Sequence, residues 1–426
     1  MKHLFNNLLK TTLVCVLALS SSQLLAKVPP EKADEIKKLE KARGGKVMGQ
    51  RVGKKVINAF DLYNEDKVNE ALEILLEIEA KDKFDKANVD RYIGGMYAGM
   101  DGKGEEAIKY MKRAIEADVL PFRDHGETLR NLGALSMQEK RYEDSIKYNR
   151  EYLRFSLDEE PKVYLSIANA YYELGQFDKV IEPAEKAKKF FAKWDKPNQN
   201  PYILIMASYY ERKMNVEATK AVEDLVKTFP TEAKWWVQLG GFYALIEQND
   251  KALSTYRMAY NQGYLTKDIH MKRLAQFYST AGIPYKSAVI QEKYMKSGLL
   301  KKDDRALATM AQTFQNAKEF EKAAQYFGEA AAMINDPDLY RKQAIASMAA
   351  ENYKEAVKAF EKALDAKPNR EGQVYLGLGE AHFYLENWKE SYVAFNKAKE
   401  SKSSARTAKG WLGFVKDTAQ RKGVAL

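Results

Sequence analysis

Apolar residues recur along this chain with the period of α-helices that come in pairs. Between residues 163 and 188, two apolar stripes of this period are separated by Gly175. The first stripe contains Tyr164, Ile167, Ala168 and Tyr171, and the second contains Phe177, Val180, Ile181, Ala184 and Ala187. Because glycine often ends a helix, the pattern predicts a helix, a tight turn and a second helix that covers the first.

The same unit repeats through most of the chain. One small or compact residue near the start of each second helix recurs at intervals of 33 to 39 residues. These anchor residues are Ala71, Ala107, Ser145, Val180, Thr219, Ala252, Ser287, Ala323, Ala356 and Ser391. A small side chain lets the two helices approach closely, and an aromatic residue four positions later fills the gap toward the next unit. The period predicts ten helix pairs from about residue 51 to residue 399.

Two copies of the unit carry a recognisable motif. The clearest contains Trp236, Leu239, Gly240 and Tyr243 in the first helix and Ala252, Tyr256 and Ala259 in the second, and another contains Ala356, Phe360, Ala363 and Pro368. This motif resembles the tetratricopeptide repeat. The resemblance implies an all-α fold, a right-handed α-solenoid (superhelix) of about ten helix pairs. It also implies a surface that binds other proteins, without catalysis.

The repeats predict the domain organisation. Repeats 1–4 are expected over residues 51–190 and repeats 5–10 over residues 202–400. Residues 191–201 separate the two groups and include two prolines, so we interpret them as a long loop, with a hinge between two halves as the alternative. Residues 401–426 are expected to form a capping helix and a tail.

The first 50 residues differ from the repeats. Residues 1–26 contain basic, apolar and small residues in the order of a cleavable signal peptide, so we expect export to the periplasm. Residues 27–50 form a charged segment. The apolar run in the signal is too short to span a membrane, and no later run is long enough, so no transmembrane segment is expected.

Composition narrows the chemistry. The formal net charge is +10, spread among many charges of both signs, and the expected export argues against nucleic acid as a partner. Cys15 is the only cysteine, and it lies within the expected signal. His125, His270 and His382 lack the spacing of metal ligands; His382 is expected in the core and His125 in a loop before a helix. We therefore expect no enzyme activity, no cofactor, no metal and no small-molecule substrate.

The tetratricopeptide resemblance implies a binding groove lined by fixed positions of each first helix. In this chain these positions hold Tyr92, Arg130, Asn169, Tyr172, Arg305, Gln312, Gln315, Asn316, Arg341, Gln373 and Tyr384. Amides and arginines suit a partner bound as an extended peptide or a helix. A solvated groove without a ligand in this segment is the alternative.

A second candidate surface is basic. Lys41, Arg43, Lys46, Arg51, Lys54 and Lys55 occur without an acidic residue between them. This pattern is typical of a solvated basic face, and the functional alternative is a docking site for acidic lipid, cell-wall polymer or protein.

The layout of the chain and its first repeat, including residues 54–60, resemble the periplasmic tetratricopeptide proteins associated with TonB energy-transduction systems of gamma-proteobacteria. The resemblance implies a scaffold for a complex of TonB, ExbB and ExbD type that supports uptake of iron compounds across the outer membrane. Two alternatives remain open. One is a scaffold for envelope, exopolysaccharide or cell-wall assembly, and the other is a carbohydrate-binding accessory module that uses Tyr172 and Tyr384.

Overall fold

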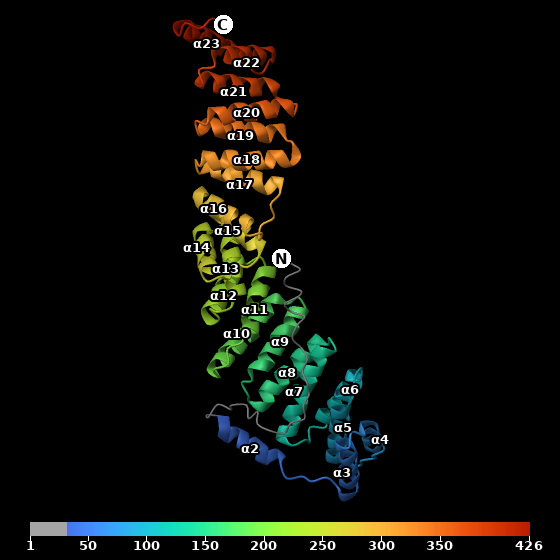
Figure 1. Cartoon of the computed structure of the whole chain (residues 1–426). Helices are drawn as coiled ribbons and strands as arrows, with labels where there is room; N and C mark the ends of the chain where they lie inside the picture. The colour runs from blue at the N-terminus through green and yellow to red at the C-terminus, as the bar shows by residue number, and fades with distance from the viewer. Residues whose placement is uncertain (1–31) are drawn as a thin grey trace. The chain divides into compact units, whose positions relative to one another are not determined.

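The fold comes from a computed structural model, which describes residues 32–426. The expected signal peptide, residues 1–26, lies outside the described residues. All regular structure in the described part is α-helical, and it divides into two compact units between Phe229 and Pro230. The predicted all-α fold class of paired helices is confirmed, with ten pairs among the described residues (Figure 1).

Unit 1 begins with a separate helix, α2 (Ala33–Arg43), within the charged segment predicted over residues 27–50. Five helix pairs follow it. They are α3 (Gln50–Asn64) with α4 (Val68–Leu76), α5 (Lys83–Ala98) with α6 (Gly104–Glu116), α7 (Phe122–Gln138) with α8 (Tyr142–Ser156), α9 (Pro161–Glu173) with α10 (Phe177–Lys193), and α11 (Gln199–Glu211) with α12 (Asn215–Thr228).

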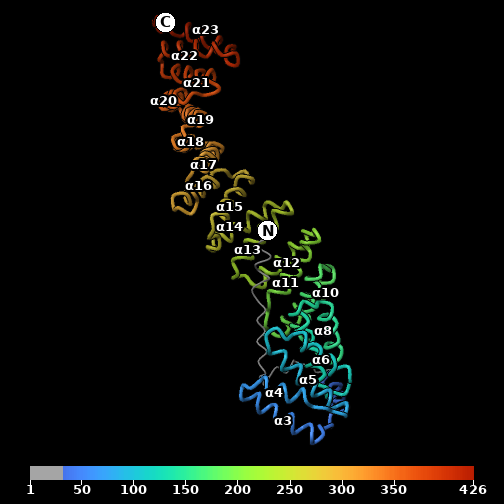
Figure 2. Tube along the Cα trace, turned by 90° about the vertical axis from the view of Figure 1, so that its right-hand side faces the viewer, coloured from blue at the N-terminus to red at the C-terminus, as the bar shows by residue number. Residues whose placement is uncertain are grey.

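Unit 2 contains the other five pairs and a final helix, and the pairs stack one on the next (Figure 2). They are α13 (Ala233–Leu245) with α14 (Asn249–Asn261), α15 (Asp268–Thr280) with α16 (Pro284–Lys296), α17 (Asp304–Asn316) with α18 (Phe320–Ile334), α19 (Pro337–Ala349) with α20 (Tyr353–Asp365), and α21 (Glu371–Tyr384) with α22 (Trp388–Glu400). The last helix, α23 (Ala405–Arg421), lies within the predicted capping segment. Its Trp411 ring stacks on Phe395 at 5.2 Å, which covers the last pair.

The anchor residues form the contact between the two helices of each pair. All ten are at most 2% exposed. The aromatic residue four positions later is also buried, as Tyr256, Phe327, Phe360 and Phe395 show. Gly240 explains the glycine of the motif, because a Cβ there would lie 2.3 Å from the Tyr256 ring. The first helix must therefore lack a side chain where the aromatic ring crosses it.

Most turns between the two helices of a pair do not have glycine at the position with positive φ. Gly175 has a positive φ of 69°, as its predicted role as a helix breaker requires. Most other turns place a charged residue in the same left-handed conformation; Glu247 and Lys318, for example, have φ of 60° and 61°. The backbone N–H of the next residue then bonds to the helix end, as in the 2.9 Å bond from Gln248 to the carbonyl of Tyr243. These hydrogen bonds offset a conformational cost of about 1 kcal/mol per residue.

The structure corrects two local predictions. The loop predicted over residues 191–201 is shorter, because α10 continues to Lys193 and α11 begins at Gln199. His125 does not lie in a loop before a helix; it is the fourth residue of α7 and is buried. In the described residues, no helix is long and apolar enough to cross a membrane.

Candidate partner-binding surfaces

The predicted groove residues all lie on first helices of the pairs. In unit 1, Tyr92 lies on α5, Arg130 on α7, and Asn169 and Tyr172 on α9. In unit 2, Arg305, Gln312, Gln315 and Asn316 lie on α17, Arg341 on α19, and Gln373 and Tyr384 on α21. The two sets belong to different compact units.

Helix α17 carries the best-defined part of the candidate groove. Arg305, Gln312 and Asn316 are exposed, together with Thr309, and their spacing puts them on one side of the helix. Gln312 donates a hydrogen bond of 3.1 Å to the side-chain oxygen of Asn316. Among the described residues, no ion pair engages Arg305. This stripe therefore presents a guanidinium and two amides to solvent.

On the neighbouring first helices the candidates are less available. Arg341 is half-buried, and its Nε lies 3.4 Å from the Asp338 carboxylate, which partly neutralises its charge. Gln373 is exposed. Tyr384 is 52% exposed, and its ring stacks on Tyr353 with centroids 4.9 Å apart. One ring face is thus already occupied.

The unit 1 candidates are mostly engaged within the protein. Arg130 forms an ion pair of 3.6 Å with Glu160. The Tyr92 ring packs edge-on against Phe60 at 4.9 Å. Tyr172, predicted as an exposed aromatic residue for sugars, is half-buried against Phe177 and is therefore a poor candidate for that role. Burial also raises the pKa of its hydroxyl.

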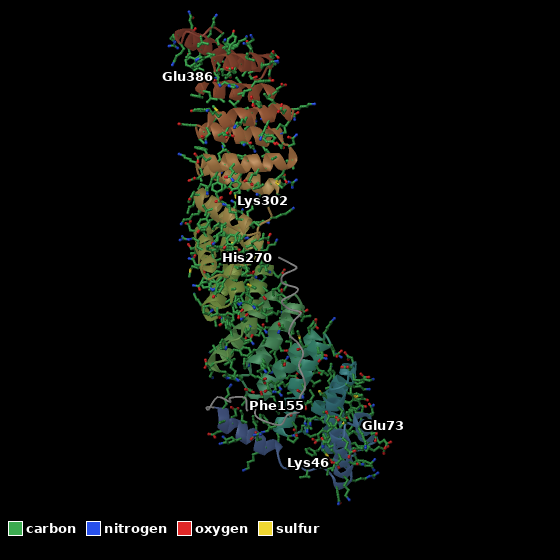
Figure 3. All side chains as sticks on the ribbon, viewed as in Figure 1. Lys46, Glu73, Phe155, His270, Lys302 and Glu386 are labelled. Atoms are coloured by element: carbon green, nitrogen blue, oxygen red, sulfur yellow. The ribbon has the colours of Figure 1, made fainter. Side chains whose placement is uncertain are left out.

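Two members of the basic segment form ion pairs with carboxylates of the same chain. Arg43 donates to both the backbone carbonyl and the carboxylate of Asp118, and it lies over the Phe155 ring at 5.0 Å. Lys46, in the segment between α2 and α3, donates to the Asp82 carboxylate at 3.0 Å (Figure 3). The charges of these two residues are thus partly balanced by acids that are far away in the sequence, and their docking role stays a prediction.

The remaining members of the basic segment stay available. Lys41, Arg51 and Lys54 are exposed, and Lys55 is half-buried. Within the described part of the chain, no ion pair joins these four to a carboxylate. They remain predicted docking residues.

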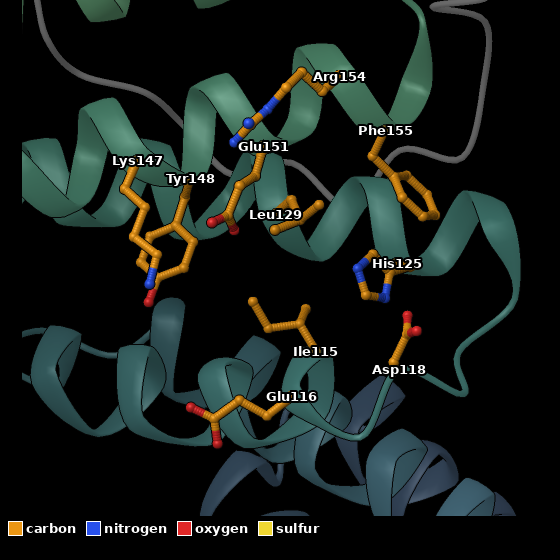
Figure 4. A pocket seen from close by; sticks show the side chains of 10 residues that line it. All are labelled: Ile115, Glu116, Asp118, His125, Leu129, Lys147, Tyr148, Glu151, Arg154 and Phe155. Atoms are coloured by element: carbon orange, nitrogen blue, oxygen red, sulfur yellow. The ribbon is translucent and has the colours of Figure 1, made fainter.

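Unit 1 also contains a hollow that the sequence did not predict. It has a volume of about 500 Å³ and lies between the end of α6, the start of α7, and α8. Figure 4 shows Ile115 and Glu116 on one side, Lys147, Glu151 and Arg154 on the other, and His125 beside Asp118 at one end. The hollow combines an apolar floor with charges of both signs.

His125 is unusual among the residues of this hollow. It is 7% exposed, its ring lies 4.5 Å from Phe155, and its Nδ1 atom has no hydrogen-bond partner among the described residues. Burial and the nearby Arg43 guanidinium lower its pKa to about 4. The imidazole is therefore neutral at neutral pH.

A second hollow lies on the other side of α8. It has a volume of about 550 Å³ and is bounded by α8, α9 and α10. Its lining residues are Arg150, Leu153, Arg154, Tyr164, Ile167, Glu182, Pro183 and Lys186. Sequence reasoning missed both hollows because it considered only first-helix positions. A signal was present in the spacing of Lys147, Arg150 and Arg154, which puts three cations on one side of α8.

The described residues contain no group of three or more acidic, histidine or cysteine side chains that could hold a metal ion. The two candidate surfaces and the two hollows instead present hydrogen-bonding, charged and apolar groups. Such groups suit the binding of another molecule.

Comparison with known proteins finds similarity in parts of the chain. The tetratricopeptide repeat family model matches residues 95–159 and 341–405, one segment in each unit. No curated protein matches the sequence. Among solved structures, a tetratricopeptide repeat protein from Parabacteroides merdae is similar over 60% of this chain and 98% of its own, with 14% identity and a TM-score of 0.32.

Two other solved structures give similar values. MamA is 17% identical over 46% of this chain and 97% of its own, with a TM-score of 0.32. YrrB, described as a tetratricopeptide protein with an unusual peptide-binding site, is 14% identical over 45% of this chain and 96% of its own, with a TM-score of 0.33. The two matched segments, residues 95–159 and 341–405, are therefore similar to tetratricopeptide repeats, and both lie within the series of ten helix pairs described above.

Proposed function

We propose that this protein is a non-catalytic scaffold that binds a protein partner through the first-helix surface of unit 2. The observation that carries the proposal is the stripe of Arg305, Gln312 and Asn316 on α17. Its polar groups face solvent, while Leu307, Phe314 and the rest of the opposite side are buried in the core of the unit. The core of unit 2 does not include these side chains, so they are available to contact a partner.

The side chains of the stripe suit a peptide. A segment without secondary structure has unpaired backbone N–H and C=O groups, and glutamine and asparagine amides can pair with both. The Arg305 guanidinium can form two parallel hydrogen bonds to a carboxylate. The proposed partner segment is therefore extended and carries an acidic side chain opposite Arg305.

We further propose that the protein works in the periplasm as an accessory of a TonB, ExbB and ExbD type complex. The supporting observations are the signal-like pattern of residues 1–26 and the resemblance in layout and first repeat. A scaffold fits this setting because the complex must connect components in the inner membrane with receptors in the outer membrane.

The test is crosslinking in intact cells followed by affinity purification of three forms of the protein. These are the wild type, the variant Arg305→Glu with Gln312→Glu, and the control Lys389→Glu, which changes an exposed lysine on the second helix α22. We expect TonB-complex components with the wild type and the control, and a loss of at least tenfold with the double variant. Equal recovery from all three would refute the role of α17.

Two further outcomes address location and pathway separately. Recovery of polymer-assembly proteins in place of TonB components would contradict the pathway and leave the scaffold role. Cell fractionation that finds the full-length, uncleaved chain in the cytoplasm would contradict the proposed location.

A further inference from the structure

We propose that the hollow between α8 and α10 in unit 1 is a second docking site, and that it binds an acidic peptide segment with a bulky apolar side chain. This site lies on second helices and on the flank of α9. It contains none of the first-helix residues of the candidate groove, and the proposal does not depend on the function proposed for unit 2.

Charge is the first argument. Three cations line the hollow, Arg150, Arg154 and Lys186, together with a single acid, Glu182. The negative charge of Glu182 is already balanced by Lys186, which donates a hydrogen bond of 2.7 Å to its carboxylate. This hydrogen bond lowers the pKa of the Glu182 carboxyl. No ion pair engages Arg150 or Arg154 within the described residues, and both are exposed. Two guanidinium groups are thus left for carboxylates from outside.

The floor of the hollow provides the apolar half of the site. Leu153 and Tyr164 contribute most of the apolar surface, because Ile167 is only 2% exposed. Tyr164 is held in place by the Phe190 ring, which stacks on it at 5.5 Å. A volume of about 550 Å³ is enough for one or two large side chains. Apolar floor and unpaired guanidinium groups lie within the same hollow, so a ligand should carry both kinds of group.

The wall formed by α10 has an irregular feature. Pro183 lies inside this helix and lines the hollow. Proline has no backbone N–H, so the carbonyl oxygen of Lys179, one turn earlier, lacks its α-helical donor. A peptide N–H can donate to such an acceptor, and so can a sugar hydroxyl, so this carbonyl does not choose between them. The apolar floor favours a peptide over a polysaccharide, because a polysaccharide has no large apolar side chain to place there.

The neighbouring hollow between α6 and α8 does not share this charge balance. Glu116 and Glu151 line it together with Lys147 and Arg154. Acidic groups there would repel the carboxylates of the proposed ligand. The hollow between α8 and α10 is therefore the one that suits an acidic ligand. Arg154 lines both hollows.

The experiment measures binding of a fluorescein-labelled peptide to the full chain by anisotropy. The probe contains the sequence Glu-Glu-Leu-Phe-Glu-Glu between neutral flanks. One control peptide replaces the four glutamates by lysine, and another replaces Leu-Phe by Ser-Ser. We expect saturable binding of the probe only, weakening at higher salt.

Matched protein variants locate the site. Arg150→Glu with Arg154→Glu should weaken binding at least tenfold. Lys220→Glu with Lys227→Glu, on α12, should leave it within twofold. Both double variants change the net charge equally, both alter exposed cations, and each removes one basic residue from the last turn of its helix. Circular dichroism spectra that match the wild type will show that each variant is folded.

Three results would overturn the proposal. The first is equal affinity in all three proteins, and the second is equal binding of the lysine peptide. The third is binding of polygalacturonate or of vesicles with anionic lipid, lost in the α8 variant, without binding of the acidic peptide. That outcome would identify a polymer or membrane surface as the occupant.

Discussion

The Ser145 hydroxyl donates a buried hydrogen bond of 2.8 Å to the backbone carbonyl of Gly133. This hydrogen bond joins the anchor residue of the second helix, Ser145, to the small residue of the first helix, Gly133. The same bond joins Ser391 to Gly379, also at 2.8 Å and also twelve residues apart. Two distant repeats therefore share the same hydrogen bond. In both, serine stands at the anchor in place of alanine, and its small side chain still allows the helices to approach closely.

Replacing Gly133 by alanine should destabilise the protein by about 1–3 kcal/mol, although alanine is the better helix former. A Cβ at this position would lie 2.4 Å from the side-chain oxygen of Asn149. Asn149 would have to move, and its hydrogen bonds to Ser145 and Ser166, of 3.2 and 3.1 Å, would weaken. The measurement is the free energy of unfolding in urea.

Gly95 is the matched control, because a Cβ there meets no atom within 4 Å. Gly95→Ala lies on an exposed part of α5 and should stabilise the protein by about 0.5–1 kcal/mol. If Gly133→Ala and Gly95→Ala changed the free energy of unfolding in the same direction, the explanation from packing would be contradicted.

Replacing Ala356 by leucine should push the helices of one pair apart. Ala356 is fully buried on α20, in a cluster with Tyr340 and Ala344. Adding a large side chain to a packed site costs about 1–3 kcal/mol. Ala332→Leu, at an exposed position on the second helix α18, is the control and should change stability by less than about 0.5 kcal/mol. A similar loss of unfolding free energy in both variants would show that the anchor position does not require a small residue.

Glu292 should make unit 2 sensitive to acid between about pH 4.5 and pH 2. Burial alone would raise the pKa of Glu292, but hydrogen bonds from Lys296, Tyr326 and Lys322, at 2.8, 2.7 and 3.0 Å, outweigh it and lower the pKa to about 2. A carboxyl with a depressed folded-state pKa stabilises the fold above its unfolded-state pKa. That contribution is lost as the pH falls toward the folded-state value.

The measurement compares urea unfolding at pH 5 and pH 3. Between these values the wild type should lose about 1–2 kcal/mol more than Glu292→Gln, whose side chain does not titrate in this range. Glu371→Gln is the control, because Glu371 is exposed and no ion pair engages it among the described residues. An equal loss in wild type and Glu292→Gln would contradict the assigned pKa.

The sequence was sufficient for the fold because its strongest signals are local. Anchors such as Ala252 and Ala356 recur at a fixed period, and each one must be small wherever two helices touch. The surface was harder to predict. Arg43 and Lys46 resemble free cations in the sequence, yet their partners Asp118 and Asp82 lie 75 and 36 residues away.

The hollows beside α8 depend on the distance between successive second helices, which no repeat motif specifies. The proposed use of Tyr172 for sugars needs an exposed ring, and the sequence could not show its burial for a related reason. Tyr171 and Tyr172 are adjacent, and the Tyr171 ring is buried, but the position of the Tyr172 ring depends on its neighbours. Here Phe177, at the start of the next helix, covers it.

His125 should make unit 1 sensitive to acid in a different range, between about pH 6.5 and pH 4. Its folded-state pKa of about 4 lies below the ordinary value of 6.5, because burial and Arg43 oppose the charged imidazolium. Above pH 6.5 the ring is neutral in both states, and its titration does not affect folding. As the pH falls below 6.5, the unfolded chain gains protons that the folded protein cannot accept, so stability is lost until about pH 4.

The test is His125→Phe, which keeps an aromatic ring beside Phe155 and removes the titration. The absolute stability of this variant can differ from that of the wild type, so the informative quantity is the change in unfolding free energy between pH 7.5 and pH 4.5. This change should be about 2 kcal/mol larger in the wild type. Arg43→Ala should give an intermediate value, because it removes one of the two causes of the shift and leaves burial. An identical pH dependence in wild type and His125→Phe would mean that the folded and unfolded chains bind a proton at His125 equally well, which would contradict the lowered pKa.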